Sequence, residues 1–402
     1  MTHAGHPYRK LMLQAVELAL EYKFLTRPNP CVGALLVKNG IAAAHGVHKG
    51  AGFPHAEAEV LEDAARKGVN PAECTMLVTM EPCRHQGRTP PCTEAIAAAG
   101  VKRLILGTLD PNPEASGGAE MLRSMGLSVE VGVAEQECLD LIDDFITWQT
   151  TDLPYVLLKL AGTLDGRIAA RTGHSRWISS RGSRVATHLL RQRVQAVMVG
   201  GNTFYRDNPK LTCRLDDPDL SEAGEEGQPL AVVATSRLPD TGQNMHLIRH
   251  RAEKTIVWTT AAAAAGPRAE ALRRLGVRVL GLPSKAGPAL RGRGMRAELD
   301  IREGLVGLRR DMDCGYVLCE GGGRLGLSLL DKGLAREFQL HLAPKILGDD
   351  EAVPLFDGRA PMHIDQALQL RITDTSRCGN DVMLALRPVR QDAAEAERQG
   401  GD

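Results

Sequence analysis

Apolar positions in the first part of the chain switch repeatedly between a helical and a strand-like period. The residues from Tyr8 to about Lys23 have the spacing of an amphipathic helix. Apolar runs of strand character follow at Cys31–Val37, Thr75–Met80, Arg103–Leu109 and Ser128–Val133, and helical patterns separate them at Ala56–Lys67, Thr93–Ala99 and Gly118–Met125. One more helix is predicted from Ala134 to about Trp148. This alternation predicts a three-layer α/β/α domain over residues 1–149.

The rest of the chain carries a second series of strand-like runs, and it is not an internal copy of the first. A short linker, Thr150–Pro154, has no periodicity and precedes it. The runs lie at Tyr155–Ala161, Val197–Gly201, Leu230–Thr235, Thr255–Thr260, Tyr316–Glu320, Glu337–Leu347 and near Val382–Leu386. They predict a second α/β domain over residues 154–388, with surface insertions at Asp216–Pro229 and Ser284–Arg296. The charged residues 389–402 predict a disordered tail.

Composition narrows the class of protein. The 402 residues are 43% hydrophobic and 24% charged, which is ordinary for a globular protein and excludes a collagen-like or disordered chain. Lys plus Arg and Asp plus Glu number 49 each, so no net charge attracts nucleic acid or an anionic membrane. Aromatic residues make up only 3%, too few for a protein that stacks single-stranded bases. We therefore expect a small-molecule partner, no nucleic acid and no membrane.

Cysteine usage points to the cytoplasm. The nine cysteines are an odd number without regular spacing, in a chain long enough not to depend on disulfides, so we expect a reducing compartment. The N-terminal residues lack a signal-peptide pattern, and no stretch approaches the roughly 20 apolar residues of a membrane span. The sequence predicts a cytoplasmic protein in which some thiols take part in chemistry.

The strongest chemical signal lies in the first domain. His55 and Glu57 follow Pro54 at the start of a predicted helix. Cys83 and Cys92 each follow a proline further along the chain. One His and two Cys form a zinc ligand set that leaves a fourth position open, as catalysis requires. Pro54 suits the first position of a helix, and the first turn of that helix can then point Glu57 at the metal. The positive helix ends would favour thiolates and a bound hydroxide. Zinc that activates water, beside a carboxylate that moves protons, is the arrangement of the zinc deaminases.

Each part of this signal has an ordinary explanation when taken alone. A His-x-Glu triplet is common by chance, and two cysteines can be core thiols. Their occurrence together, in this order, each beside a proline at a predicted strand-to-helix junction, favours metal binding. The generic deaminase signature has two residues between its cysteines, whereas Cys83 and Cys92 are separated by eight.

That long spacing is informative, because the run Glu81–Cys92 resembles the deaminase half of the bifunctional riboflavin-biosynthesis deaminase/reductases. The likeness extends through the first domain, at Pro28–Gly33, Gly46–His48, Gly52–Glu57 and Asp110–Pro113. It implies a cytidine-deaminase-like fold, Glu57 as the proton shuttle, and one zinc ion per chain bound by His55, Cys83 and Cys92. It also implies substrate contacts from Asn29, His48, Arg88 and Asp110.

Without the resemblance, three of these positions have simpler interpretations. Asn29 would be a turn residue, and His48 a polar residue at the end of a strand. Cys31 stands where the family usually has an aliphatic residue or Met, so we interpret it as a core residue and not as a fourth ligand.

A glycine-rich motif marks the second domain. Gly321–Gly326 follows a predicted strand, opens a helix and matches the G-x-G-x-x-G pattern, whose glycines let backbone amides approach a dinucleotide phosphate. Fewer than 80 residues follow it, so a Rossmann domain, which needs several further strand and helix units, is not expected. By itself the motif supports a nucleotide site and a simple tight turn equally.

The second domain as a whole resembles the reductase half of the same family. The resemblance rests on Leu158–Arg167, Ser175–Ser179, Val199–Thr203, Arg206–Thr212 and Cys319–Gly323, in the family's order. It implies a dihydrofolate-reductase-like α/β domain with NADPH as its cofactor. NADP contacts would come from Ala161, Trp177, Thr203, Asp207, Ser236, Gly322, Gly323, Arg324, Leu325, Gly326, Leu327 and Ser328. Substrate contacts would come from Ser175, Arg191, Leu211, Arg214 and Glu320.

Three of these residues would have structural roles if they were taken alone. Trp177 would be a core aromatic, Arg191 a solvated charge on a helix, and Asp165 a turn residue. In the resembling family, Arg191 and Arg214 would instead clamp the sugar phosphate, since planar guanidinium groups match phosphate oxygens.

The resemblance implies two successive reactions and a homo-oligomer. The first is zinc-dependent hydrolytic deamination of 2,5-diamino-6-(5-phosphoribosylamino)pyrimidin-4(3H)-one. The second is NADPH-dependent reduction of the ribosyl side chain, giving 5-amino-6-(5-phosphoribitylamino)uracil. The residues alone leave two other functions open. A nucleic-acid base deaminase with an accessory domain is disfavoured by the neutral charge and few aromatics. In a non-catalytic zinc protein with a nucleotide-sensing domain, Glu57 would be dispensable.

Overall fold

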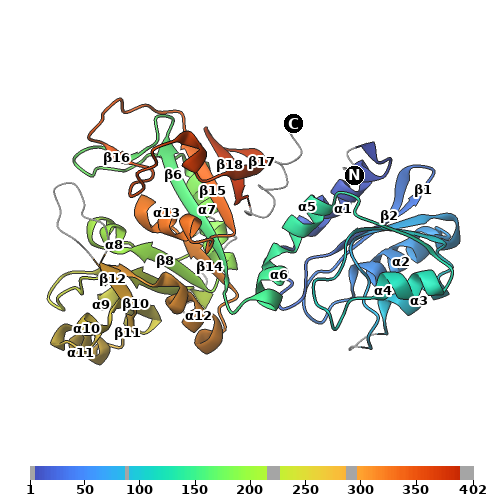
Figure 1. The fold of residues 1–402 in the computed structure, drawn as a ribbon, viewed down its shortest axis with the longest axis horizontal. Coiled ribbons are helices and arrows are strands. Elements are labelled where there is room, and N and C mark those ends of the chain that lie inside the picture. The colour runs from blue at the N-terminus through green and yellow to red at the C-terminus, as the bar shows by residue number, and fades with distance from the viewer. Residues whose placement is uncertain (1–4, 87–89, 215–226, 287–296, 390–402) are drawn as a thin grey trace. The chain divides into compact units, whose positions relative to one another are not determined.

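The computed structural model describes residues 5–86, 90–214, 227–286 and 297–389. The chain divides into two compact units, Met1–Thr151 and Asp152–Asp402, and each is described by itself (Figure 1). No helix among the described residues is long and apolar enough to cross a membrane. All nine cysteines are free thiols. Most of the two predicted insertions, and all but the first residue of the predicted tail, lie outside the described residues.

The first unit is a five-stranded sheet with helices on both faces (Figure 1). The strands lie in the order β2-β1-β3-β4-β5, with β1 antiparallel to its neighbours and β3, β4 and β5 parallel. Their bounds are β1 (Gly33–Lys38), β2 (Ile41–Val47), β3 (Thr75–Met80), β4 (Arg103–Thr108) and β5 (Ser128–Val131). The helices are α1 (Arg9–Leu20), α2 (Ala56–Lys67), α3 (Cys92–Ala98), α4 (Gly118–Ser124), α5 (Glu135–Leu141) and α6 (Asp143–Thr150).

Two apolar clusters hold this sheet between its helices. One joins α1 and α5 to one face, through residues such as Met12 and Cys138. The other joins α2, α3 and α4 to the opposite face, through residues such as Val60 and Ile96. Cys31 is buried in the first cluster, as expected for a core residue.

The sequence pattern missed two features of this unit. Strand β2, Ile41–Val47, was not predicted because it consists largely of Ala and Gly, which carry little strand signal. The single helix predicted from Ala134 to Trp148 is two helices, α5 and α6, which meet at the non-helical Ile142. Two aspartates open α6, where the positive end of a helix stabilises them, so the chain starts a new helix there.

The second unit is built on a nine-stranded sheet in the order β11-β10-β9-β8-β14-β6-β15-β18-β17. Neighbours from β11 to β15 are parallel, and the last two strands are antiparallel. The bounds are β6 (Tyr155–Thr163), β8 (Ala196–Gly200), β9 (Leu230–Ala234), β10 (Thr255–Thr260), β11 (Arg278–Leu282), β14 (Tyr316–Cys319), β15 (Glu337–Ala343), β17 (Leu370–Cys378) and β18 (Asp381–Pro388). Two short ribbons pair β7 (Arg167–Ala169) with β16 (Val353–Pro354) and β12 (Ser284–Ala286) with β13 (Ala297–Leu299).

Helices flank this sheet as well (Figure 1). They are α7 (Arg181–Arg193), α8 (Gly201–Asp207), α9 (His246–His250), α10 (Ala261–Ala264), α11 (Pro267–Arg274), α12 (Ile301–Met312) and α13 (Gly323–Asp331). The chain spreads outward from β8 to β11 and then returns to place β14 between β8 and β6. Such a reversal opens a crevice at the carboxyl ends of the strands, where ligands bind in open α/β sheets.

The predicted strands of this unit are all present, but six were missed. β7, β12, β13 and β16 are only two or three residues long, β11 has three exposed residues of five, and β17 is a largely exposed edge strand. None of these carries the apolar run that marks a buried parallel strand. The run predicted to reach Leu347 ends at Ala343, because Pro344 lacks the N–H that a strand needs.

Candidate active sites

Three ligand-type side chains converge in the first unit. The ligand atoms of His55, Cys83 and Cys92 all lie within 4.8 Å of one another. Nδ1 of His55 is 3.3 Å from Sγ of Cys92 and 3.7 Å from Sγ of Cys83. The edges of a tetrahedral zinc site with sulfur and nitrogen ligands are about 3.5 Å, so these separations fit zinc. The backbone N–H of Cys92 also donates to Sγ of Cys83, which favours the thiolate that a metal needs.

The starts of two helices bring these ligands together. His55 caps α2 in an extended conformation, and Cys92 is the first residue of α3. Free N–H groups at both helix starts make the site electropositive. The prediction that Pro54 occupies the first helical position is wrong, because Pro54 precedes the cap. Likewise Pro91 caps α3 with ψ of 136°, since a proline ring fixes φ but leaves ψ free to stay extended.

Glu57 stands in the first turn of α2, with 4% of its surface exposed. Burial raises the pKa of its carboxyl group to about 7, so it can take up and release a proton near neutral pH. The close packing of α2 against β2 depends on Gly46. A Cβ on Gly46 would lie 2.3 Å from the backbone nitrogen of Val60, so only glycine lets the helix pack this close.

A short hydrogen-bond chain orients Asn29 beside the metal ligands. His48 is buried, and burial lowers the pKa of its ring, so the ring is neutral. Its Nδ1 donates to the carbonyl oxygen of Pro54 at 2.9 Å, so Nε2 accepts from the amide nitrogen of Asn29 at 3.1 Å. The amide oxygen of Asn29 is then oriented to accept a hydrogen bond from a ligand.

Glu81, to which the sequence analysis gave no role, supports the loop that carries Asp110. Its buried carboxylate accepts hydrogen bonds from the backbone N–H groups of Asp110, Gly117 and Ala119, at 2.8 to 3.2 Å. Burial raises the pKa of Asp110 itself. A charged residue between a buried strand and a ligand cysteine was the available signal for Glu81. The predicted substrate residue Arg88 lies outside the described residues.

Most residues predicted to contact NADP gather at the carboxyl edge of the second sheet. Ala161 lies near the end of β6, Thr203 and Asp207 belong to α8 after β8, and Ser236 follows β9. The segment Gly322–Ser328 spans the cap and first turns of α13, after β14. Because β9, β8, β14 and β6 are neighbours in the sheet, these segments adjoin.

Two glycines of the motif, Gly322 and Gly323, have different surroundings. A Cβ on Gly323 would lie 2.0 Å from the carbonyl oxygen of Leu355, so this glycine is needed for packing. A Cβ on Gly322 would meet only Oγ1 of Thr203, at 3.7 Å, within the described part of the chain. Gly322 caps the nine-residue helix α13, whose free N–H groups therefore face open space beside a hydroxyl. That arrangement fits a phosphate group.

Arg191 and Glu320 form a bidentate ion pair that is largely, though not completely, buried, with 11% and 14% of their side chains exposed. Nε and NH2 of Arg191 donate to the two carboxylate oxygens at 2.6 and 2.7 Å. Although burial opposes the charge, Arg191 holds the pKa of Glu320 below its usual range. NH1 of Arg191 donates to the carbonyl oxygen of Thr212, whose hydroxyl accepts from Arg214. The structure thus brings Arg191 and Arg214 together at Thr212, and Arg191 is not a solvated helix charge.

The remaining predicted residues lie in loops. Trp177 is 63% exposed, with the Arg184 guanidinium 4.5 Å from its ring centre, so it is not a core aromatic. Ser175 lies in the turn just before it. Leu211 is buried and has a φ of +51°, in the loop that leads to Thr212.

Both units match known protein families over long segments. Residues 154–384 match the RibD C-terminal domain, and residues 6–108 match the cytidine and deoxycytidylate deaminase zinc-binding region. Riboflavin biosynthesis protein RibD of Aquifex aeolicus is 36% identical, over 94% of this chain and 97% of its own length. RibD of Escherichia coli is 33% identical, over 93% and 98%.

The chain belongs to the RibD family. A solved diaminohydroxyphosphoribosylaminopyrimidine deaminase/5-amino-6-(5-phosphoribosylamino)uracil reductase from Thermotoga maritima agrees, with a TM-score of 0.69 and 33% identity over 96% of this chain and 99% of that one. As a RibD-type protein it is a bifunctional deaminase and reductase of riboflavin biosynthesis. The predicted cytidine-deaminase-like and dihydrofolate-reductase-like domains are confirmed.

One residue of the RibD reductase motif had no role in the sequence analysis. Lys159 points from β6 toward Glu320 and α7, and it is half-buried. Removal from water lowers the pKa of its ammonium group, despite the attraction of Glu320. A single lysine within the apolar run Tyr155–Ala161 was the signal that could have singled it out.

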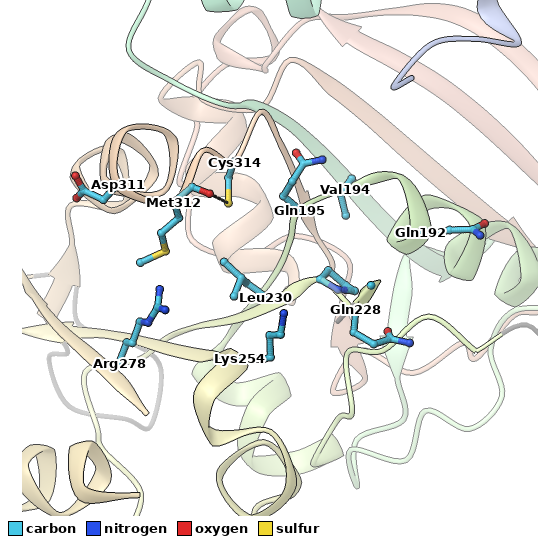
Figure 2. A pocket seen from close by; sticks show the side chains of 12 residues that line it. Gln192, Val194, Gln195, Gln228, Leu230, Lys254, Arg278, Asp311, Met312 and Cys314 are labelled. Carbon is cyan, nitrogen blue, oxygen red and sulfur yellow. Dashed lines mark hydrogen bonds between the residues drawn. The ribbon is translucent and has the colours of Figure 1, made fainter. Parts of the chain in front are cut away.

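A separate hollow of about 580 Å³ opens at the amino ends of β8, β9, β11 and β14 (Figure 2). Lys254, Arg278 and Gln192 are among its lining residues. None of the residues predicted from the RibD family lines it, so it is distinct from the carboxyl edge that holds them.

Proposed function

We propose that the two units act in sequence on one phosphoribosyl pyrimidine. The first unit replaces an amino group of 2,5-diamino-6-(5-phosphoribosylamino)pyrimidin-4(3H)-one with oxygen and releases ammonia. The second unit reduces the ribosyl group of that product with NADPH, giving 5-amino-6-(5-phosphoribitylamino)uracil. The observation that carries the proposal is the convergence of His55, Cys83 and Cys92 beside the buried carboxyl group of Glu57.

In the first unit, His55, Cys83 and Cys92 would hold one zinc ion. A zinc ion with three protein ligands supplies an activated water for attack on a ring carbon. Glu57 takes a proton from the attacking water and delivers it to the departing amino group, which leaves as ammonia. Burial favours the protonated form of this carboxyl group, which helps Glu57 to hold the proton between the two steps.

Asn29, His48 and Asp110 would position the pyrimidine. The amide oxygen of Asn29 accepts a hydrogen bond from an amino or ring N–H group, and His48 prevents the amide from turning over. Asp110 supplies a further acceptor at the end of β4, on a loop fixed by Glu81. Arg88 would add a charge for the phosphate.

In the second unit, NADPH would lie across the carboxyl edge of the sheet and supply the hydride. The N–H groups at the start of α13 and the hydroxyl of Thr203 would bind its phosphates. Ala161, Trp177, Asp207 and Ser236 would complete the cofactor site.

Reduction places a hydride on C1′ and, as the bond from C1′ to the ring oxygen breaks, a proton on that oxygen. We assign the proton to Lys159. Its ammonium group lies within the electrostatic influence of Glu320, and burial lowers its pKa, so it releases a proton more readily than a solvated lysine. Arg191 and Arg214, which meet at Thr212, would bind the sugar phosphate together with Ser175 and Leu211.

The deaminase proposal is tested by Glu57→Gln. This variant should retain one zinc per chain while ammonia release falls by about 10²- to 10⁴-fold, because the proton carrier is lost and the ligands are not. Metal analysis and an ammonia assay measure both. Full ammonia release by the variant would overturn the assignment of Glu57 as the proton carrier, whereas a wild-type enzyme that holds zinc and releases no ammonia would favour a non-catalytic zinc module.

The reductase proposal is tested by Lys159→Met. Hydride transfer to the deaminated intermediate should fall by about 10²- to 10⁴-fold, while NADPH still binds. Stopped-flow absorbance of NADPH and fluorescence titration separate the two effects. Unchanged hydride transfer would remove Lys159 from the chemistry.

The location of the protein is also a proposal. Two of the nine free thiols are the zinc ligands assigned above, and they must stay reduced to bind the metal. We propose that the protein works in the reducing cytoplasm.

A further inference from the structure

A layer of polar side chains lies on one face of the second sheet, beneath α7. Successive residues of a strand point to opposite faces. Leu158 and Leu160 of β6 pack against the apolar core, so Lys159 between them faces the other side. In β15, Phe338 packs against the same apolar core. His341 is three residues further along and therefore points to the opposite face, the same face as Lys159.

His341 is linked to a carboxylate through one hydroxyl group. Its Nδ1 is 2.9 Å from Oγ of Ser183, and that Oγ is 2.6 Å from Oδ2 of Asp381. None of the three residues is more than 2% exposed. The backbone N–H of Ser180 donates to the same carboxylate oxygen. Although burial opposes it, the hydrogen bonds from Ser183 and Ser180 hold the pKa of Asp381 below its usual range, so Asp381 is ionised.

The direction of this chain follows from the chemistry of its members. An ionised carboxylate only accepts, so the hydroxyl of Ser183 donates to Asp381, and its oxygen accepts from His341. Burial and the positive charge of Lys159 lower the pKa of His341 to about 4, so the ring carries one proton. That proton is on Nδ1, and Nε2 has a lone pair. Within the described residues, this buried Nε2 has no hydrogen-bond partner.

We propose that His341 is a positioning residue of the reductase half. Asp381 and Ser183 fix its tautomer, so that Nε2 offers a lone pair, and never an N–H group, to the polar layer that holds Lys159. In the register of β6 and β15, His341 is opposite Ala161, two residues beyond Lys159 on the same face. The lone pair favours the ammonium form of Lys159, which is the form that donates a proton. The inference rests on the role proposed above for Lys159.

The charges around Lys159 explain why a neutral acceptor matters there. Glu320, Asp381 and the thiol of Cys378 favour its ammonium form, whereas burial and Arg191 oppose it. Glu320 is already bound on both oxygens by Arg191, and its attraction is thereby reduced. An oriented lone pair stabilises the ammonium group without adding another buried charge.

The pH dependence of hydride transfer tests this inference. A proton donor must be protonated, so the rate falls as pH rises through the pKa of Lys159. His341→Phe keeps a ring and removes the lone pair, and it should move this alkaline limb to lower pH by about half a unit, the size expected of a charge–dipole attraction without a direct hydrogen bond. Ser183→Ala frees the tautomer and should move it in the same direction.

The matched control is Thr187→Val, one turn further along α7. It removes a buried hydroxyl that bonds only to the carbonyl oxygen of Ser183 in the described structure, and it should leave the limb in place. A limb that stays at the wild-type pH in both His341→Phe and Ser183→Ala would overturn the inference. A limb displaced equally in Thr187→Val would also overturn it, because a general packing effect would then explain the shift.

A direct measurement of the tautomer does not depend on activity. Nitrogen-15 NMR of the histidine-labelled enzyme, with the His341 signal assigned by its loss in His341→Phe, should show a protonated Nδ1 and a bare Nε2. A protonated Nε2 would overturn the inference even if Lys159 proves to be the proton donor. Conversely, if Lys159→Met leaves hydride transfer unchanged, the proposed function fails at Lys159 while the NMR result still decides the tautomer.

Discussion

At the scale of single residues, both proposed sites depend on charged or titratable side chains that the backbone holds away from water. Glu57 gains its near-neutral pKa from burial in the first turn of α2. Glu320 keeps its charge because Arg191 binds both of its oxygens. Burial shifts the pKa of each group. It also makes a partner necessary, because an unpaired charge that is removed from water is costly.

The ion pair of Arg191 and Glu320 should therefore dominate the stability of its surroundings. In Glu320→Gln the buried guanidinium loses its counter-charge, and the second unit should lose about 3 kcal/mol of unfolding free energy. The control Asp357→Asn removes the exposed ion pair with Arg324, and it should cost less than about 1 kcal/mol. Chemical denaturation of each variant measures the difference. Equal losses in the two variants would contradict the prediction.

The same pair predicts a pH dependence with a definite sign. The pKa of Glu320 is lower in the folded than in the unfolded protein. Its stabilisation is therefore complete above the unfolded value of about 4.3 and is lost as pH falls through the folded value below it. The wild-type advantage over Glu320→Gln in thermal unfolding should be constant from about pH 7 to 5 and shrink below about pH 4. An advantage that grows on acidification would be incompatible with this assignment.

At the scale of elements, the starts of helices carry the chemistry. α2 and α3 present the metal ligands, and α13 presents free N–H groups to the proposed cofactor. The starts of α2 and α13 are each positioned by a close backbone contact that a side chain would block, at Gly46 for α2 and at Gly323 for α13.

The two glycines at the start of α13 should respond differently to the same added methyl group. Gly323→Ala places a Cβ 2.0 Å from the carbonyl oxygen of Leu355, so it should destabilise the second unit by at least about 2 kcal/mol. Gly322→Ala has room to fold, but its methyl group enters the proposed phosphate site beside Thr203, so it should raise the KM for NADPH about tenfold or more. Denaturation and steady-state kinetics distinguish the two. A folded Gly322→Ala enzyme with unchanged KM would place the cofactor elsewhere.

The sequence predicted elements best where the residues formed a continuous apolar run or an amphipathic helical pattern that fitted only one type of element. β3 and α2 begin and end at the predicted residues. The edge strand β17 and the small-residue strand β2 were missed because their pairing comes from neighbours distant in the chain. At the site, motif residues such as His55 and Cys83 could be predicted from the sequence. The pairing of Arg191 with Glu320 could not, because it joins a helix and a strand end 129 residues apart.

Glu81, Lys159 and His341 show the same limit. Each is an isolated polar residue in or beside an apolar strand, and only the fold shows what it faces. Glu81 binds the backbone N–H groups of Asp110, Gly117 and Ala119, in the loop before α4 and in its first turn, which lie 29 to 38 residues further along the chain.

At the scale of the whole molecule, each of the two proposed reactions takes place in one unit. Removal of zinc with a chelator should therefore stop ammonia release and leave NADPH oxidation on the deaminated intermediate within about twofold of its starting rate. Adding zinc back should restore ammonia release. Loss of both activities on chelation would show that the second unit depends on the metal and would refute independent sites.

The most direct measurement is a coupled assay of the zinc-loaded enzyme with the diaminopyrimidine substrate, in which ammonia and NADPH are followed separately. The account predicts one ammonia per substrate whether or not NADPH is present, followed by oxidation of one NADPH per ammonia released. NADPH oxidation that precedes or proceeds without ammonia release, or a zinc-loaded enzyme that releases none, would contradict it.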